Sequence, residues 1–245
     1  MKQEKVFNKL FLFSLLCICV LAFISNYACI SETPRDAQTA EAEVEEIPFD
    51  DTAGEQSLTR NCYFIFDGSG SMGDNCAGQK KIDGAKEALR RFMSKVPDDV
   101  NLGLYVFDGR GDREVVALGS GNRVEFMQAI EDIRDGGGTP LAEAIRTGTD
   151  QLIAQYKKQL GYGAYGMIIV SDGEASGLER AARETKSFGV IIMHTIALCM
   201  ERGHPLKEYS HAYYEADDYE ALEKALVEAV AEAEVFEPTE FVEKK

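Results

Sequence analysis

From Arg60 onward, short apolar runs of strand length alternate with longer segments of helical periodicity. The run Cys62 to Phe66 (CYFIF) predicts a buried strand, and Lys81 to Val96 carries apolar residues on one helical face until Pro97 stops it. Such alternation is typical of a sheet covered by helices on both faces. We therefore predict a doubly wound α/β domain over residues 59–236, with a mostly parallel six-stranded sheet and one short antiparallel edge strand.

The same pattern places the other elements. Further strands are expected at 100–107, 114–118, 167–170, 190–198 and 212–215, and further helices from Asn122, from Thr139, over 178–188 and over 218–236. In the helix after Asn122, apolar residues recur at every third position: Val124, Met127, Ile130 and Ile133. Right-handed crossovers leave the working face of such a sheet at the carboxyl ends of its strands, where a functional site is expected.

Residues 1–29 have the composition of an export signal. Lysines precede a largely apolar run from Leu10 to Ile24, which is short for a bilayer span of about 20 residues, so cleavage is favoured over a permanent anchor. Ala28-Cys29 resembles the cleavage point of a bacterial lipoprotein, although Asn26 stands where that family usually has Leu. A lipid on Cys29, an uncleaved signal anchor and plain secretion all remain open. Each places the rest of the chain outside the cytosol, and the first two attach it to a membrane of the cell envelope.

Residues 30–58 are acidic and poor in large apolar side chains, which predicts a flexible tether, and 237–245 form a short C-terminal tail. The whole chain has 42 acidic and 26 basic residues and a net charge of −16, concentrated in the segments that flank the domain. Because a phosphate backbone would be repelled by this charge, nucleic acid is excluded as a partner.

Candidate metal-binding side chains are concentrated directly after the first strand, in the turn Asp67-Gly68-Ser69-Gly70-Ser71-Met72-Gly73. We call this turn the metal loop. One carboxylate and two hydroxyls at alternate positions can converge on one point. Hard oxygen donors with few carboxylates suit Mg²⁺, with Mn²⁺ or Ca²⁺ as alternatives.

Together with Thr139 in a glycine-rich loop and Asp172 in Ser171-Asp172-Gly173, this turn resembles the metal-ion-dependent adhesion site (MIDAS) of von Willebrand factor A-type (VWA) domains. The resemblance covers about residues 59–236. It implies that Ser69, Ser71 and Thr139 are metal ligands, and that Asp67 and Asp172 act directly or through water.

The resemblance also implies what the site does. A cation held by so few formal charges stays electrophilic, so an Asp or Glu of a partner protein can complete its coordination. We expect a protein-binding module rather than an enzyme, with no small-molecule substrate. An alternative is a scaffold subunit of an envelope complex in which the metal is structural. Met72 and the loops 109–112, 161–166 and 200–205 are expected to surround the metal-binding edge of the sheet and to select the partner.

Each motif residue also has a simpler explanation. Thr139-Pro140 is a common helix start with threonine as N-cap, and Ser69 and Ser71 could belong to an ordinary turn. Two rival chemistries share the loop. Gly68-x-Gly70-x-x-Gly73 approximates a dinucleotide fingerprint, but the acidic residue of the next strand is the distant Asp108. Ser71 could be a hydrolase nucleophile with Asp172 and one of the histidines His194, His204 or His211.

In an oxidising compartment the cysteines of the domain matter. Cys76 follows the metal loop and Cys199 ends a strand, so both are expected on the metal face, whereas Cys62 begins its strand at the opposite end. We predict a disulfide between Cys76 and Cys199.

Overall fold

The computed structural model describes residues 47–48, 54–173, 175–200 and 203–232. The predicted signal with Cys29, most of the tether and the tail 237–245 lie outside these residues, as does the last part of the helix predicted over 218–236. Within the described part, no helix combines the length and the apolar character needed to cross a bilayer.

The strands and helices alternate as the sequence predicts. The strands are β1 (Arg60–Asp67), β2 (Asn75–Cys76), β3 (Gln79–Lys80), β4 (Asn101–Asp108), β5 (Gly111–Gly119), β6 (Ala164–Ser171), β7 (Ile191–Leu198) and β8 (Ala212–Ala216). The α-helices are α2 (Lys81–Met93), α3 (Arg123–Asp132), α4 (Leu141–Lys158), α5 (Leu178–Ser187) and α6 (Tyr219–Glu232). Short 3₁₀ turns, η1 (Gly70–Gly73) and η2 (Pro205–Glu208), complete the fold.

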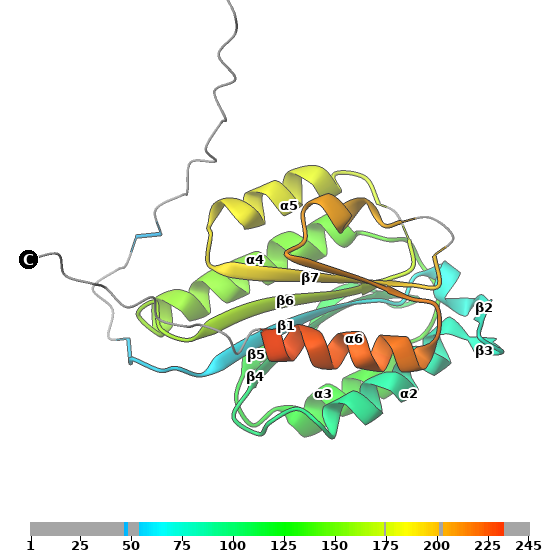
Figure 1. Cartoon of the computed structure of the whole chain (residues 1–245), viewed down its shortest axis with the longest axis horizontal. Coiled ribbons are helices and arrows are strands. Elements are labelled where there is room, and N and C mark those ends of the chain that lie inside the picture. The colour runs from blue at the N-terminus through cyan, green and yellow to red at the C-terminus, as the bar shows by residue number, and fades with distance from the viewer. Residues whose placement is uncertain (1–46, 49–53, 174, 201–202, 233–245) are drawn as a thin grey trace, which may run out of the picture. The chain divides into compact units, whose positions relative to one another are not determined.

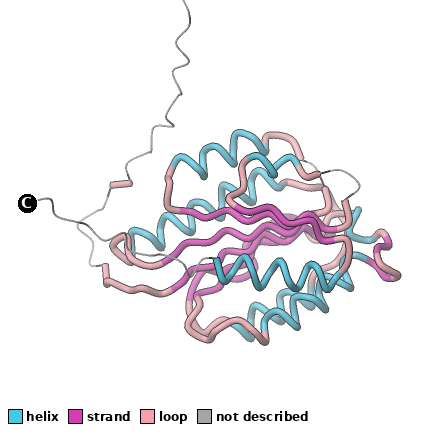
Figure 2. The backbone as a smooth tube through the Cα atoms, in the orientation of Figure 1, coloured by secondary structure: helices cyan, strands magenta, loops and turns pink. Residues whose placement is uncertain are grey.

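Six strands form one sheet in the order β5-β4-β1-β6-β7-β8 (Figures 1 and 2). β5 runs antiparallel to β4, and all the other neighbours in this sheet are parallel. Helices α4 and α5 cover one face, and α2, α3 and α6 cover the other (Figure 1). The predicted fold class is confirmed, including the antiparallel edge strand. β1 lies between β4 and β6, so the strand order reverses there, which is where an open α/β sheet has its binding crevice.

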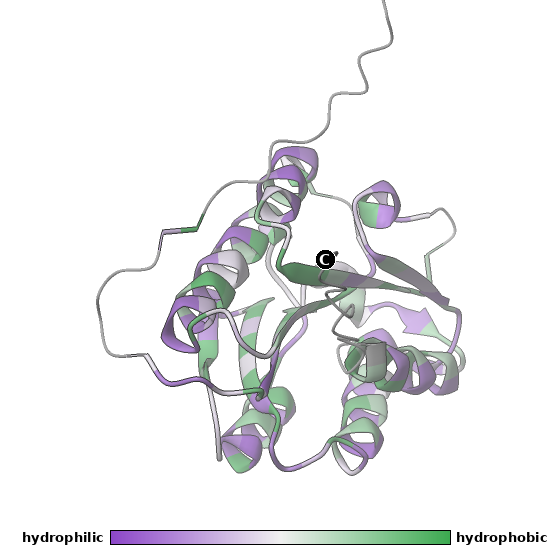
Figure 3. Ribbon diagram, turned by 60° about the vertical axis from the view of Figure 1, so that its left-hand side comes forward, coloured by the Kyte–Doolittle hydropathy of each residue, from purple (hydrophilic) through white to green (hydrophobic). Residues whose placement is uncertain are grey.

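Alternation along β1 divides the core into two layers. Phe64 and Phe66 belong to the cluster under α2, α3 and α6, whereas Tyr63 and Ile65 belong to the cluster under α4 and α5. All four are at most 2% exposed. The helices carry hydrophobic residues on one face and hydrophilic residues on the other (Figure 3), so the fold buries one stripe of each helix against the sheet.

The three-residue apolar repeat of α3 does not coincide with the face that the helix buries. Val124 is 70% exposed, and Phe126 is fully buried instead, with its ring 5.2 Å from that of Phe64. A three-residue spacing falls short of the helical repeat of 3.6, so four residues spaced in this way drift around the helix. The buried face uses Phe126 and Ile130, and Ile133 just after the helix is also buried.

The loop 161–166 is also misplaced in the sequence prediction. β6 begins at Ala164 and is parallel to β1, so residues 161–163 lie at the amino ends of the strands. This end is opposite to the metal loop. The position follows from chain direction, because a loop that leads into a parallel strand cannot lie at the carboxyl edge.

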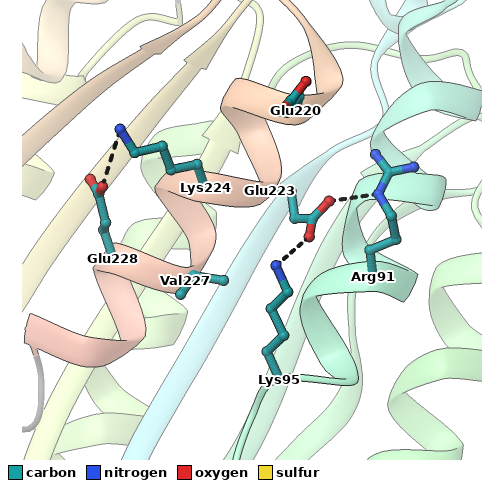
Figure 4. A pocket seen from close by; sticks show the side chains of 7 residues that line it. All are labelled: Arg91, Lys95, Glu220, Glu223, Lys224, Val227 and Glu228. Carbon is teal, nitrogen blue, oxygen red and sulfur yellow. Dashed lines mark hydrogen bonds and ion pairs between the residues drawn. The ribbon is translucent and has the colours of Figure 1, made fainter.

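Helix α6 is fixed to α2 at several points. The Tyr219 ring lies against Gly84 of α2, where an added Cβ would be only 2.1 Å from the ring, so glycine is required for this close approach. Glu223 of α6 accepts hydrogen bonds from Arg91 and Lys95 of α2, each at 2.6 Å (Figure 4). These ion pairs hold the pKa of Glu223 below its ordinary value.

The hairpin β2–β3 stands between the metal loop and α2. Cys76 of this hairpin forms a disulfide with Cys199, directly after β7, as predicted, while Cys62 is a buried free thiol. The Tyr219 hydroxyl donates to the Cys76 carbonyl at 2.9 Å. The hairpin is therefore joined both to the end of β7 and to the start of α6.

The last residues of the predicted tether lie against the domain. The Glu55 amide donates to the Lys158 carbonyl at 3.1 Å, and the Gln159 side-chain amide donates to the Ser57 carbonyl at 3.0 Å. Both contacts are at the C-terminal end of α4, near the start of β1 and far along the strands from the metal loop.

We expect the double variant Cys76→Ser, Cys199→Ser to have a free energy of unfolding about 2–4 kcal/mol lower than that of the wild type. The reason is that the disulfide closes a loop with a sequence separation of 123 residues and restricts the unfolded chain. Urea unfolding followed by circular dichroism measures the difference. Wild-type protein in reductant is the control and should match the variant. Equal stability of the variant and the oxidised wild-type protein would contradict the prediction.

Candidate metal site

The five predicted ligands come from three segments at the carboxyl edge of the sheet. Asp67 is the last residue of β1, and Asp172 follows the last residue of the neighbouring β6. Ser69 and Ser71 lie in the turn after β1, and Thr139 precedes α4. The parallel register of β1 and β6 therefore brings the two carboxylates to the same edge.

Asp67 is fully buried at the base of the site. One carboxylate oxygen accepts a hydrogen bond from the Ser69 amide at 2.8 Å, and the other accepts a hydrogen bond from the Ser171 hydroxyl at 2.6 Å. Burial raises the pKa of Asp67, against the lowering effect of these hydrogen bonds, and the nearby Asp172 raises it further. The site therefore holds a carboxylate whose charge is poorly compensated by the protein around it.

The turn after β1 is held in place by close packing. An added Cβ at Gly68 would be 2.9 Å from the Asp108 side chain, so only glycine allows β1 and β4 to approach here. The prediction that Met72 faces the partner is wrong, because its side chain is fully buried and packs into the core. With the turn fixed in this way, the Ser69 and Ser71 hydroxyls face each other at 3.1 Å.

A second glycine-rich loop, residues 136–138, is bonded to this turn. The Gly136 amide donates to the Gly68 carbonyl at 3.0 Å, and the Gly70 amide donates to the Gly137 carbonyl at 3.3 Å. Gly137 has a φ of 78°, a conformation that favours glycine. A Cβ at this position would be 2.9 Å from the Asp108 carbonyl oxygen, so the backbone of Gly137 lies close to that of Asp108. These contacts bring Thr139 to the site.

Thr139 is not the N-cap of α4. The helix begins at Leu141 and Pro140 occupies the N-cap position, so the simpler explanation of Thr139-Pro140 from sequence is wrong. The Thr139 hydroxyl lies 3.9 Å, and an Asp67 carboxylate oxygen 4.0 Å, from the point where a Cβ would stand on Gly173. The Thr139 hydroxyl and the Asp67 carboxylate therefore both lie near Gly173, at the same edge of the sheet.

Asp172 completes the cluster. The Ser71 hydroxyl donates to one of its carboxylate oxygens at 2.8 Å, and the ammonium of Lys81 donates to the other at 2.7 Å. Sequence reasoning did not single out Lys81 or the hydroxyl of Ser171. The available signals were weak: Lys81 is the first residue of a predicted helix, and Ser171 lies in the quoted Ser-Asp-Gly turn.

The donor set fits a hard divalent cation. Three hydroxyls and two carboxylates from the predicted positions gather at one edge, with neither sulfur nor imidazole among them, and such oxygen donors suit Mg²⁺ or Mn²⁺. In the described ranges, no group of three or more His, Cys, Asp or Glu side chains is arranged to hold an ion. A metal site at this edge would therefore depend on the hydroxyl groups of Ser69, Ser71 and Thr139.

The geometry disfavours both rival chemistries. Ser71 is hydrogen-bonded to Ser69 and Asp172 rather than to an imidazole, and burial lowers the pKa of His194 to about 4. The Asp108 carboxylate accepts a hydrogen bond from the Arg113 guanidinium. Burial acts to raise the pKa of Asp108, but this guanidinium and two backbone amides outweigh it and lower that pKa to about 2. Asp108 is therefore committed to the protein rather than available for a ribose.

Comparison with known proteins agrees with this architecture. Residues 62–174 match the family model of the von Willebrand factor type A domain. YwmD of Bacillus subtilis (strain 168) is 30% identical over 106 residues, which are 38% of this chain and 47% of YwmD. YwmC of the same organism is 27% identical over 139 residues, 50% of this chain and 58% of YwmC. The chain thus spans about half the length of the curated relatives it matches.

Solved structures share the fold at low sequence identity. The pilus adhesin SpaC from Lactobacillus rhamnosus GG aligns with a TM-score of 0.58 and 15% identity, over 74% of this chain and 31% of SpaC. The manganese-loaded TRAP protein of Plasmodium vivax aligns with a TM-score of 0.52 and 16% identity, over 69% of this chain and 74% of that protein. Residues 62–174 are thus similar to the von Willebrand factor type A domain, and the solved structures show that the fold is shared.

Because the Asp67 carboxylate is buried, we expect its negative charge to destabilise the folded protein when no metal is bound. In chelator at pH 7, Asp67→Asn should be more stable than wild type by about 1 kcal/mol. The pKa of Asp67 is raised in the folded state, so the wild type gains stability as pH falls through that pKa, whereas the variant does not. The difference in free energy of unfolding between variant and wild type should therefore become smaller on acidification.

Urea unfolding at pH 7 and pH 5 tests this prediction. Asp98→Asn is the matched control, because the Asp98 side chain is 99% exposed and the same change there should leave stability nearly unaltered. A less stable Asp67→Asn variant at pH 7 would contradict the prediction.

Proposed function

We propose that this chain is a metal-dependent protein-binding module. In this proposal Ser69, Ser71 and Thr139 bind a divalent cation, Mg²⁺ in the first place, and Asp67 and Asp172 support it directly or through water. An Asp or Glu side chain of a partner protein then completes the coordination. The observation that carries the proposal is the convergence of these five oxygen-bearing side chains at the switch point of the sheet.

The site's charge supports recruitment of an acidic partner rather than catalysis. Two carboxylates of the chain, one of them already paired with Lys81, leave a bound dication incompletely neutralised. Ser71 lacks the imidazole contact that would activate it as a nucleophile among the described residues. By their names, one structural neighbour is a pilus adhesin and another was loaded with manganese, which supports binding to protein through metal.

We further propose that the module is displayed outside the cytosol, in the cell envelope. The lysine-flanked apolar run of residues 1–29 supports export, through a lipid on Cys29, a signal anchor or secretion. The Cys76–Cys199 disulfide adds independent support, because such bonds persist mainly in oxidising compartments.

Calorimetric titration of Mg²⁺ and Mn²⁺ into chelator-stripped protein tests the metal site. Wild type should bind saturably, whereas Ser69→Ala and Asp172→Ala should bind at least about tenfold more weakly, since each loses an oxygen donor or a charge. Ser94→Ala is the matched control, because this exposed serine at the end of α2 donates only to the Arg91 carbonyl among the described contacts. Absence of binding by folded wild type would overturn the proposal.

The partner's chemistry can be tested with an array of peptide pairs that differ only in one Glu or Gln. Metal-loaded protein should be retained more strongly by Glu than by Gln peptides, because only a carboxylate replaces water at the cation with a charged oxygen. Chelator and Ser69→Ala should abolish the difference. Equal retention of both peptides would favour the alternative in which the metal is structural.

A further inference from the structure

Lys81 places a fixed positive charge inside the proposed metal site. Its ammonium lies 2.7 Å from an Asp172 carboxylate oxygen, with the two side chains 12% and 0% exposed. The other oxygen of that carboxylate accepts the Ser71 hydroxyl. This pair is therefore largely shielded from water and from salt, unlike the surface ion pairs of the domain.

The backbone around Lys81 is built to hold it there. Its amide donates to the Asp74 carbonyl at 2.9 Å, which closes the hairpin β2–β3 onto the metal loop. The Tyr219 hydroxyl lies 3.3 Å from the carbonyl of the preceding Lys80, and the disulfide ties the same hairpin to the end of β7. Three independent contacts thus fix the start of α2 beside Asp172.

The charges at the site have a simple consequence. Asp67 and Asp172 contribute two negative charges, and Lys81 removes one. A divalent cation then leaves the site positive, and an incoming carboxylate makes it neutral. Without Lys81, the same cation would already neutralise both aspartates, and attraction for a further carboxylate would be weaker.

We propose that Lys81 is an internal counter-ion that weakens the binding of a divalent cation and strengthens the binding of a carboxylate to the loaded site. The inference rests on the proposed function, because it concerns the same site. It assigns opposite effects of one side chain to the two binding steps. A purely structural lysine would not produce this pair of effects.

The test measures Mn²⁺ affinity of the full chain from the electron paramagnetic resonance signal of free Mn²⁺. Lys81→Met and Lys81→Gln should bind Mn²⁺ at least about tenfold more tightly, because a close, shielded positive charge is lost. The Gln variant can still donate a hydrogen bond to Asp172, which preserves the fold if Lys81→Met does not. Lys81→Arg keeps the charge and should stay near wild type.

Lys80→Met is the matched control. It removes the same charge one residue away, but its side chain is 51% exposed and its ammonium is 3.8 Å from Asp135. Screening by water and salt should limit its effect on Mn²⁺ affinity to about threefold.

The second step uses acetate as the carboxylate probe. Acetate that displaces water from bound Mn²⁺ lowers the water-proton relaxation rate of the loaded protein. The Lys81→Gln variant should require several-fold more acetate than wild type, while Lys80→Met should not.

The outcomes separate the inference from the proposed function. Wild type that binds Mn²⁺, beside Lys81 variants that bind it no more tightly or bind acetate equally well, would overturn the inference alone. Absence of Mn²⁺ binding in wild type and in every Lys81 variant would overturn both. Binding only by the Lys81→Met and Lys81→Gln variants would support the role of Lys81 and overturn metal binding by the natural chain.

Discussion

The parallel pairing of β1 with β4 on one side and β6 on the other is the constraint on which the site depends. It brings Asp67 and Asp172 to one edge, and it presses the turn after β1 against Asp108 so closely that position 68 must be glycine. The hydrogen bonds between this turn and the loop 136–138 then bring Thr139 to the same place. A shift in the pairing of β1 would separate all of these groups at once.

The cluster illustrates how a binding site departs from the rules of a stable core. Asp67 is buried with its pKa raised, and Asp172 is buried beside it, although buried carboxylates oppose folding unless they are paired. The protein compensates only partly, through the hydroxyls of Ser171 and Ser71 and the ammonium of Lys81. A divalent cation would supply the remaining charge, so a tendency to bind metal and a cost in stability have the same origin.

Much of the fold follows from the sequence, because strand and helix periods are local properties. The succession of strands and helices along the chain, the antiparallel edge strand and the Cys76–Cys199 disulfide are confirmed, whereas the metal ligands stay a prediction. The sequence was not sufficient where burial or proximity depends on tertiary packing. In α3 the three-residue apolar repeat includes Val124, but packing against Phe64 buries Phe126 instead. The role of Lys81 could not be inferred, because its distance to Asp172 depends on how the hairpin β2–β3 and α6 position the start of α2.

The chain enters and leaves the described fold at the same end. β1 starts there at Arg60, and α6 returns there from the carboxyl edge, with its last described residue at Glu232 (Figure 1). The site lies at the other end of the strands. A pull between a partner bound at the proposed site and the N-terminal flank would therefore act along β1, and would load its hydrogen bonds with β4 and β6 together in shear rather than one at a time. For the proposed binding function, this direction of β1 would resist tension applied along the strands.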